Sequence, residues 1–263
     1  MRCFILEDNK GINSIKKDDS ILSVRDVVKA YKLGSGDTLT VLDHINYELP
    51  RGQLIMLMGR SGSGKTTLMN LLSTLDDVTA GDIIFHSRDR LNENEDGSSG
   101  KVEASDTASD LGSYRDYNYS EMKQEDKELL RRFKIGFVFQ SIALIPVMTA
   151  YENVDFGLRT AEYKGDRDRR VKEVLESVGL ADRAKHFPGE LSGGERQRIA
   201  IARAMAHRPE ILFADEPTGA LDTASGIYIA ELFKSMTRNE GITVVMTTHD
   251  IRLSELADML IQL

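Results

Sequence analysis

The stretch Gly59-Arg60-Ser61-Gly62-Ser63-Gly64-Lys65-Thr66 decides the fold of this chain. It fits the pattern G-x-x-x-x-G-K-[ST], follows the apolar run Leu54-Ile55-Met56-Leu57-Met58, and precedes leucines at helical spacing. In a strand–loop–helix setting, the glycines let backbone N–H groups surround phosphate oxygens, the lysine reaches the terminal phosphates, and the threonine hydroxyl binds Mg²⁺. The positive end of the helix dipole adds to this attraction. The setting therefore predicts a phosphate-binding loop and disfavours a simple glycine-rich turn.

Two further apolar runs have the same character as residues 54–58. They are Ile211-Leu212-Phe213-Ala214 and Ile242-Thr243-Val244-Val245-Met246. Short and almost continuously apolar runs are typical of strands buried on both faces of a parallel sheet. Polar residues follow each run at once, with Asp215 and Glu216 after the first. Because ligands collect at the carboxyl ends of strands in open α/β sheets, we expect a site where these ends meet.

The rest of the chain divides into segments of different composition. Residues 23–49 indicate an antiparallel, half-exposed sheet, because strand-like runs there alternate with turn residues. Residues 1–22 are expected to form a flexible N-terminal extension. Residues 88–121 carry nine acidic against four basic residues and only three of Val, Ile, Leu, Phe and Met. Such a segment cannot bury enough apolar surface to offset its ordering entropy, so we predict a mobile acidic insertion.

Length, charge and hydropathy exclude several classes of protein. The chain has 263 residues and a formal net charge of −8, which argues against a nucleic-acid binder with a broad basic surface. Its longest unbroken apolar run is five residues, far short of the ~20 that span a bilayer. The N-terminus lacks the apolar region of a secretory signal, and Cys3 is the only cysteine. We therefore expect a cytosolic protein without internal disulfides.

Four residues are candidates for the chemistry at the strand ends. Asp215 is placed to bind a metal, and Glu216 to orient and deprotonate an attacking water, because phosphoryl transfer needs a positioned nucleophile. Alone, such a pair of acids is equally typical of a turn; beside a phosphate loop the catalytic interpretation is preferred. Gln140 and His249 also follow apolar runs and are placed to contact metal, water or phosphate. Each of them taken singly is more typical of a structural residue.

A second phosphate cradle is suggested by Leu191-Ser192-Gly193-Gly194-Glu195, which precedes another helical pattern. Glycines and a serine at a helix N-terminus form an anion site by the dipole argument. Taken singly, a plain helix cap at Ser192 is the simpler interpretation. One phosphate loop together with two cradles indicates a dimer that shares nucleotides across its interface.

These motifs, in this order, resemble the nucleotide-binding subunit of an ATP-binding cassette (ABC) transporter. They correspond to the Walker A (59–66), Q-loop (Gln140), signature (191–197), Walker B (211–216), D-loop (220–222) and H-loop (His249) motifs. The resemblance implies an α/β P-loop NTPase over residues 23–263, with a RecA-like parallel-sheet core, an antiparallel β subdomain and a helical signature subdomain at about 141–195. Within the family, the motifs resemble those of macrolide exporters, lipoprotein-releasing ATPases and antimicrobial-peptide exporters, a group that also holds a cell-division ATPase.

The resemblance also implies ligands and residue roles. ATP would be bound by Tyr31, which stacks on adenine, and by Gly59, Arg60, Ser61, Gly62, Ser63, Gly64, Lys65, Thr66 and Thr67. Mg²⁺ would be bound by Thr66, Gln140 and Asp215. Two subunits, identical or paired, would close head to tail, so that Leu191, Ser192, Gly193, Gly194 and Glu195 of one meet the γ-phosphate held by the other. Asp222 would lie in the D-loop of this interface, Glu216 would be the general base, and His249 would steady the γ-phosphate.

A membrane partner is implied as well. The apolar segment 142–148 is expected either to pack inside the helical subdomain or to form a groove for a coupling helix of an integral membrane permease. The chain would then lie on the cytoplasmic face of the cell membrane as the ATPase of an exporter or of a lipoprotein- or peptide-extruding system. An ATPase that regulates a membrane partner, such as a cell-division or cell-wall hydrolase activator, stays open. A soluble DNA-repair or translation ATPase is disfavoured by the acidic charge balance.

Three departures from the family pattern stand out. The distance from Lys65 to Gln140 is 140 − 65 = 75 residues, longer than usual, and the acidic insertion accounts for it. Arg60 stands where proline is frequent, and Glu195 where glutamine is frequent. Neither of these changes removes a ligand group.

Overall fold

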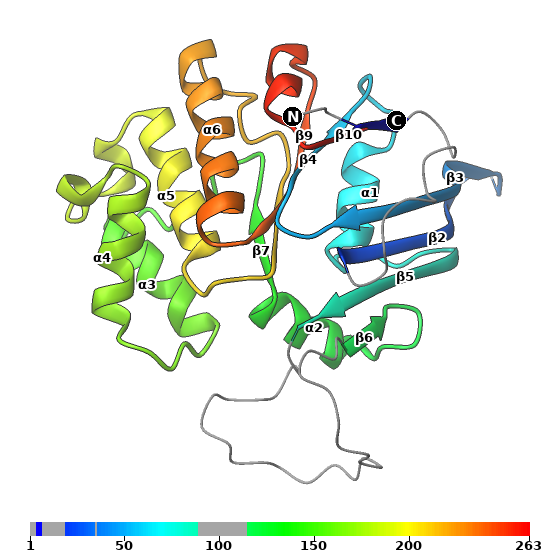
Figure 1. Ribbon diagram of the computed structural model, residues 1–263, viewed down its shortest axis with the longest axis horizontal. Helices are drawn as coiled ribbons and strands as arrows, with labels where there is room; N and C mark the ends of the chain where they lie inside the picture. The colour runs from blue at the N-terminus through cyan, green and yellow to red at the C-terminus, as the bar shows by residue number, and fades with distance from the viewer. Residues whose placement is uncertain (1–3, 7–18, 35, 89–114) are drawn as a thin grey trace, which may run out of the picture.

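The computed structural model describes residues 4–6, 19–34, 36–88 and 115–263. They form a six-stranded sheet in the order β1-β10-β4-β9-β8-β7 and a four-stranded sheet in the order β3-β2-β5-β6 (Figure 1). The first is parallel and comprises β1 Phe4–Leu6, β4 Leu54–Met58, β7 Ile135–Val138, β8 Ile211–Ala214, β9 Thr243–Thr248 and β10 Met259–Gln262. The second is antiparallel and comprises β2 Ser20–Lys32, β3 Thr38–Pro50, β5 Ala80–Ser87 and β6 Arg115–Asn118. The predicted α/β class with an added antiparallel sheet is confirmed.

The three apolar runs of the sequence become neighbouring strands. Leu54 pairs with Val244 across β4 and β9, and Ile211 pairs with Thr243 across β8 and β9. Successive side chains of a strand point to opposite faces, so both faces of these strands must be covered. In β4, Leu54, Met56 and Met58 join one core cluster, while Ile55 and Leu57 join another. This double burial explains why the run is continuously apolar.

Helices cover both faces of the parallel sheet. They are α1 Lys65–Leu72, α2 Gln124–Phe133, α3 Ala150–Thr160, α4 Arg167–Ser177, α5 Gly193–Met205 and α6 Thr223–Asn239, with short 3-10 turns η3 Ala181–Arg183, η4 Pro188–Glu190 and η5 Ile251–Leu256. Leucines of α1 pack in the cluster that also contains side chains of the antiparallel sheet. In Figure 1, α3, α4 and α5 gather on the side away from that sheet. No helix in the described part of the chain combines the length and apolarity needed to span a membrane.

The N-terminal residues differ from the flexible extension expected over 1–22. Phe4–Leu6 form β1, which pairs in parallel with β10, Phe4 opposite Met259. Ser20, Ile21 and Leu22 belong to β2 and are buried. An apolar triplet can form a strand wherever an edge offers unpaired backbone groups, and β10 would otherwise be such an edge. Residues 1–3 and 7–18 lie outside the described residues.

The acidic segment 88–121 also differs at its C-terminal end. Arg115–Asn118 form β6, antiparallel to β5, and Tyr119 is 5% exposed with its hydroxyl donating to the carbonyl oxygen of Leu72. Ser120 donates to Asp82, and α2 begins only at Gln124. Tyr117 and Tyr119 supply apolar surface that the count of Val, Ile, Leu, Phe and Met does not include. Residues 89–114 lie outside the described residues, so the mobility predicted there stays a prediction.

Candidate active site

The loop 59–64 joins β4 to α1 at the carboxyl edge of the parallel sheet. Gly62 and Gly64 have φ of 81° and 95°, in the left-handed region that favours glycine. A Cβ at Gly64 would lie 3.0 Å from a methyl carbon of Leu42. Lys65 opens α1, is 7% exposed, and donates from Nζ to the carbonyl oxygens of Gly59 and Arg60, both at 3.0 Å. The lysine is therefore folded beneath its own loop.

Several features of this loop fit a polyphosphate. The N-terminus of α1 has no side-chain cap and no acidic residue in its first turn, so its N–H groups face outward without a side-chain acceptor. Ser63 Oγ is buried and has no hydrogen-bond partner among the described residues. Thr66 is exposed and Thr67 half-buried. A buried cation, an orphaned hydroxyl and an uncapped helix end are the donors that phosphate oxygens require.

The acidic pair after β8 is tied to β9 through one threonine. Thr247 Oγ1 donates to Asp215 Oδ1 at 2.7 Å and accepts from the backbone N–H of Glu216, also at 2.7 Å. Glu216 has φ of 42°, which costs a non-glycine residue ~1–2 kcal/mol. Such strain persists only where surrounding contacts enforce it. The chain therefore fixes the direction of the Glu216 side chain.

Two further strand ends meet Glu216. Gln140, two residues beyond β7, donates from Nε2 to Glu216 Oε2 at 3.1 Å. His249, which follows β9, has Nδ1 3.9 Å from Glu216 Oε1, and its side chain is 68% exposed. The three residues predicted to be catalytic thus lie around one carboxylate, at the ends of three neighbouring strands.

The residues predicted to bind the metal come from three elements. Thr66 lies in the first turn of α1, Gln140 follows β7 and Asp215 follows β8. Among the described residues, no group of three or more His, Cys, Asp or Glu is arranged to hold a metal ion. Mg²⁺ is usually bound by one or two protein groups together with water and substrate phosphates, rather than by an all-protein cage. The donor set present therefore fits Mg²⁺ bound with a nucleotide.

Tyr31 lies near the end of β2 and is 39% exposed. Its hydroxyl donates to Asp76 Oδ2 at 2.9 Å, and Lys29 Nζ lies 4.8 Å from the centroid of its ring. Burial and the adjacent Asp76 carboxylate raise the pKa of Tyr31, while Lys29 and a hydrogen bond with Thr67 oppose this rise. The contact with Thr67 places the tyrosine beside the phosphate loop. Sequence reasoning missed Lys29 and Asp76, since no local pattern marks them.

The second cradle is a capped helix end. Ser192 Oγ accepts from Glu195 N at 3.2 Å, and the Glu195 carboxylate accepts from Ser192 N at 2.8 Å, which is a complete capping box. The backbone and side chain of Ser192, followed by Arg183, lower the pKa of Glu195 to about 2. The capping interpretation is therefore confirmed, and binding of phosphate at Ser192 stays a prediction. Leu191 is buried beneath this turn.

The predicted D-loop lies next to the second cradle. Asp222 caps α6 by accepting from Ser225 N at 3.0 Å and Ser225 Oγ at 2.6 Å. A Cβ on Gly193 would lie 3.8 Å from Leu221, and one on Gly194 would lie 3.5 Å from Ser225 Oγ. The N-termini of α5 and α6 are thus neighbours on the surface, and Ser192 and Asp222 are both exposed there.

The segment 142–148 is partly packed against the helical side and partly exposed, so it has features of both alternatives that the sequence left open. Leu144 packs against the core cluster of the helical side, while Val147 is 82% exposed. The buried amide of Asn153 donates to the carbonyl oxygens of Ile145, Met148 and Thr149 and accepts from the N–H of Ile145. These bonds hold the segment in one shape while leaving an apolar tip in solvent.

Comparisons with known proteins identify the family of the chain. A profile of the family described as "ABC transporter" matches residues 42–219. The ABC transporter ATP-binding protein MJ1508 of Methanocaldococcus jannaschii is 37% identical, over 92% of this chain and 95% of that protein. YbbA of Escherichia coli, an ABC transporter ATP-binding protein, is 38% identical over 93% of this chain and 95% of its own length.

Solved structures agree as well. A dimeric, post-hydrolysis structure of the ATP-binding cassette MJ0796 bound to ADP and Pi matches with a TM-score of 0.72 and 34% identity, over 92% of this chain and 94% of that one. A second dimeric structure of MJ0796, described as a bacterial ABC transporter cassette, matches with a TM-score of 0.72 and 35% identity over the same shares. The chain therefore belongs to the ABC transporter family, as an ATP-binding and ATP-hydrolysing subunit with a P-loop NTPase fold.

Proposed function

We propose that two copies of this chain close head to tail around Mg-ATP, and that hydrolysis drives an integral membrane permease of an exporter or of a lipoprotein- or peptide-extruding system. The observation that carries the proposal is the convergence of Gln140, Glu216 and His249 at three adjacent strand ends. The strand that leads into the phosphate loop, β4, pairs with β9 in the same parallel sheet. Carboxyl ends of parallel strands share one edge, so loop and carboxylate face one site.

The phosphate loop binds and orients the triphosphate. Lys65 leaves its two carbonyl contacts and turns its ammonium to the terminal phosphates, while the orphaned Ser63 hydroxyl donates to a phosphate oxygen. Tyr31 stacks on the adenine. Thr66, Asp215 and Gln140 would hold Mg²⁺, which would neutralise charge on the phosphates. Thr247 acts indirectly, because its hydrogen bond to Asp215 fixes the direction of that carboxylate.

Glu216 serves as the general base. Its carboxylate accepts a proton from the attacking water. The Gln140 amide donates to Oε2, and the other oxygen, Oε1, lies on the side of His249. His249 steadies the γ-phosphate from its exposed position. Because the backbone of Glu216 is held in a strained conformation by Thr247, the base is oriented before the nucleotide arrives.

The second copy completes the site. Residues 191–195, at the N-terminus of α5, supply N–H groups and the hydroxyl of the exposed Ser192 to the γ-phosphate held by the partner. Asp222, beside it at the start of α6, lies in the same interface. The segment 142–148 meets the permease, since its rigid and partly apolar tip suits a docking surface. The chain then lies peripherally at the cytoplasmic face of the membrane.

The substitution Glu216→Gln tests the assignment of the base. A general base contributes about 10²–10⁴-fold, so we expect Mg-ATP hydrolysis by the purified protein to fall by at least ~100-fold while ATP binding is retained. The exposed Glu231 of α6 provides a matched control, and Glu231→Gln should leave hydrolysis unchanged. Hydrolysis by Glu216→Gln within a few-fold of the unmodified protein would refute the mechanism.

The membrane partner is tested by purification from the native membrane. We expect a permease to co-purify with the unmodified chain and to be lost with Val147→Glu, which places a charge on the apolar tip. A partner without a substrate pathway would instead assign the ATPase to regulation of a membrane protein. Capture of a permease that is unaffected by Val147→Glu would contradict docking at this segment.

A further inference from the structure

The aromatic ring of Tyr31 is held by a pair of charged residues. Lys29 Nζ donates to Asp76 Oδ1 at 2.7 Å, and the Tyr31 hydroxyl donates to the other carboxylate oxygen, Oδ2, at 2.9 Å. The same ammonium lies 4.8 Å from the centroid of the tyrosine ring. Asp76 therefore joins the lysine and the tyrosine through its two oxygens, and the lysine covers part of the ring.

The pair is itself firmly placed. The Lys29 side chain is only 10% exposed, and Nζ also donates to the carbonyl oxygen of Asp77 at 2.7 Å. A buried ammonium must keep such partners, because losing one leaves a charge without compensation. The turn that carries Asp76 is bound to β2 on both sides of Lys29: Thr79 N donates to Val28 O, and Ala30 N donates to Thr79 Oγ1.

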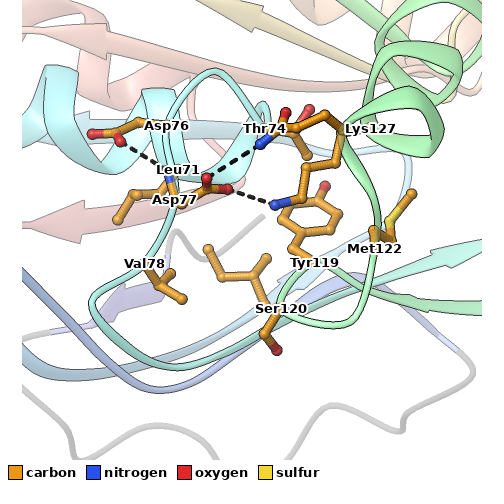
Figure 2. Close-up of a pocket in the computed structure, with 11 residues that line it drawn as sticks. Leu71, Thr74, Asp76, Asp77, Val78, Tyr119, Ser120, Met122 and Lys127 are labelled. Atoms are coloured by element: carbon orange, nitrogen blue, oxygen red, sulfur yellow. Dashed lines mark hydrogen bonds and ion pairs between the residues drawn. The ribbon is translucent and has the colours of Figure 1, made fainter.

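The turn is supported on its other side by α2 (Figure 2). Asp77 accepts from Lys127 Nζ at 2.5 Å and from Gln124 Nε2 at 3.3 Å. Asp76 and Asp77 line a cavity of about 310 Å³ between the end of α1, β5 and α2. These contacts involve neither the phosphate loop nor the strand ends around Glu216. Asp76 N also donates to the carbonyl oxygen of Asn70 in α1, so the position of Asp76 is set by α1, β2 and α2 rather than by the strand ends around Glu216.

We propose that Lys29 and Asp76 are positioning residues that hold the Tyr31 ring ready to stack on the base of the nucleotide. This inference rests on the proposed role of Tyr31. With the ammonium on one face of the ring, the base stacks on the other, and the cation strengthens the ring's preference for a single orientation. A ring that is already fixed loses less rotamer freedom on binding than a free one. The resulting gain in affinity is confined to ligands that carry a nucleotide base.

The test compares ADP with inorganic tripolyphosphate, which lacks a base, by isothermal titration calorimetry. We expect Asp76→Ala and Lys29→Met each to weaken ADP binding by about 3- to 10-fold, the effect of freeing one side chain. Binding of tripolyphosphate should be unchanged, which also shows that the variants are folded. In a Tyr31→Ala background, Asp76→Ala should add less than twofold. Asp126→Ala, an exposed acid of α2, is the matched control.

The other outcomes separate this inference from the proposed function. Equal weakening of both ligands by Asp76→Ala would assign Asp76 to general support of the fold and overturn the inference. Weakening of ADP binding by Tyr31→Ala but not by Asp76→Ala would leave the base-stacking role of Tyr31 intact and also overturn it. An ADP affinity unchanged in Tyr31→Ala would refute the proposed role of Tyr31 itself.

Discussion

The strand-end site around Glu216 and the helix-end surface around Ser192 differ in how they are held. The groups at Glu216 come from residues far apart in the sequence: Gln140 donates to its carboxylate, and Thr247 bonds its backbone and Asp215. At the helix ends, Ser192 bonds Glu195 and Asp222 bonds Ser225, so the caps are formed within three residues.

This difference indicates which chemical groups of the site can be oriented within a single copy of the chain. Long-range contacts orient the base and the metal-binding carboxylate inside a single chain. The local caps only stabilise their own helices, and they leave both helix N-termini exposed next to each other. Such a surface can contact another molecule. This fits the proposal that the helix ends of one copy complete the nucleotide site of the other. Four experiments test this difference: one in each region, one that combines both regions, and one on the cap alone.

The largest effect is expected in the phosphate loop that serves the strand-end site. Lys65→Ala removes the buried ammonium, and loss of one such charged donor in an active site lowers turnover by about 100- to 1,000-fold. ATP binding should weaken in parallel, measured by calorimetry beside a steady-state hydrolysis assay. Lys172→Ala, which breaks an exposed pair with Asp168, is the control and should leave both readouts unchanged. Equal rates of hydrolysis by both variants would show that Lys65 is not part of the site.

The helix-end surface is tested by Ser192→Asp. Aspartate is as good a helix cap as serine, but its charge lies beside the Glu195 carboxylate, so we expect a loss of stability no greater than the ~1 kcal/mol expected for Ser192→Ala. A carboxylate facing the partner's γ-phosphate should nevertheless lower hydrolysis by roughly 10- to 100-fold, since juxtaposed like charges are costly. Full activity in a stable Ser192→Asp protein would show that Ser192 only caps α5 and does not contact the partner's phosphate.

Mixing two inactive proteins sharpens the same comparison. In a head-to-tail pair of one Lys65→Ala copy and one Ser192→Asp copy, one site carries both defects and the other carries neither. Random pairing then restores about a quarter of the unmodified rate, because half of the dimers gain one intact site of two. A mixture no more active than its components would contradict a site shared between copies.

The same contrast explains what the sequence could predict. The phosphate loop, the apolar strands and the Ser192 cap are local patterns, and each lies where it was expected. Thr247, Lys29 and Asp76 act through partners 31 to 47 residues away, so no local pattern reveals them. Strand β1 was missed because three apolar residues form a strand only when β10 lies beside them. Strand β6 was missed because the acidic composition of its surroundings outweighed Tyr117 within it and Tyr119 just after it in the average.

The smallest effect concerns the Glu195 carboxylate of the cap. Its pKa is about 2 in the folded chain against an ordinary value of 4.5. A depressed folded pKa adds stability above pH ~4.5, and that stability is lost as the pH falls towards 2. Glutamine can also complete a capping box but does not titrate, so Glu195→Gln should remove this part of the acid sensitivity. Urea unfolding at pH 7, 5, 4 and 3 should show the unmodified chain losing its advantage over the variant as the pH falls, with Glu231→Gln as control. An advantage that stays constant from pH 7 to pH 3 would show that the ionised carboxylate does not stabilise the cap.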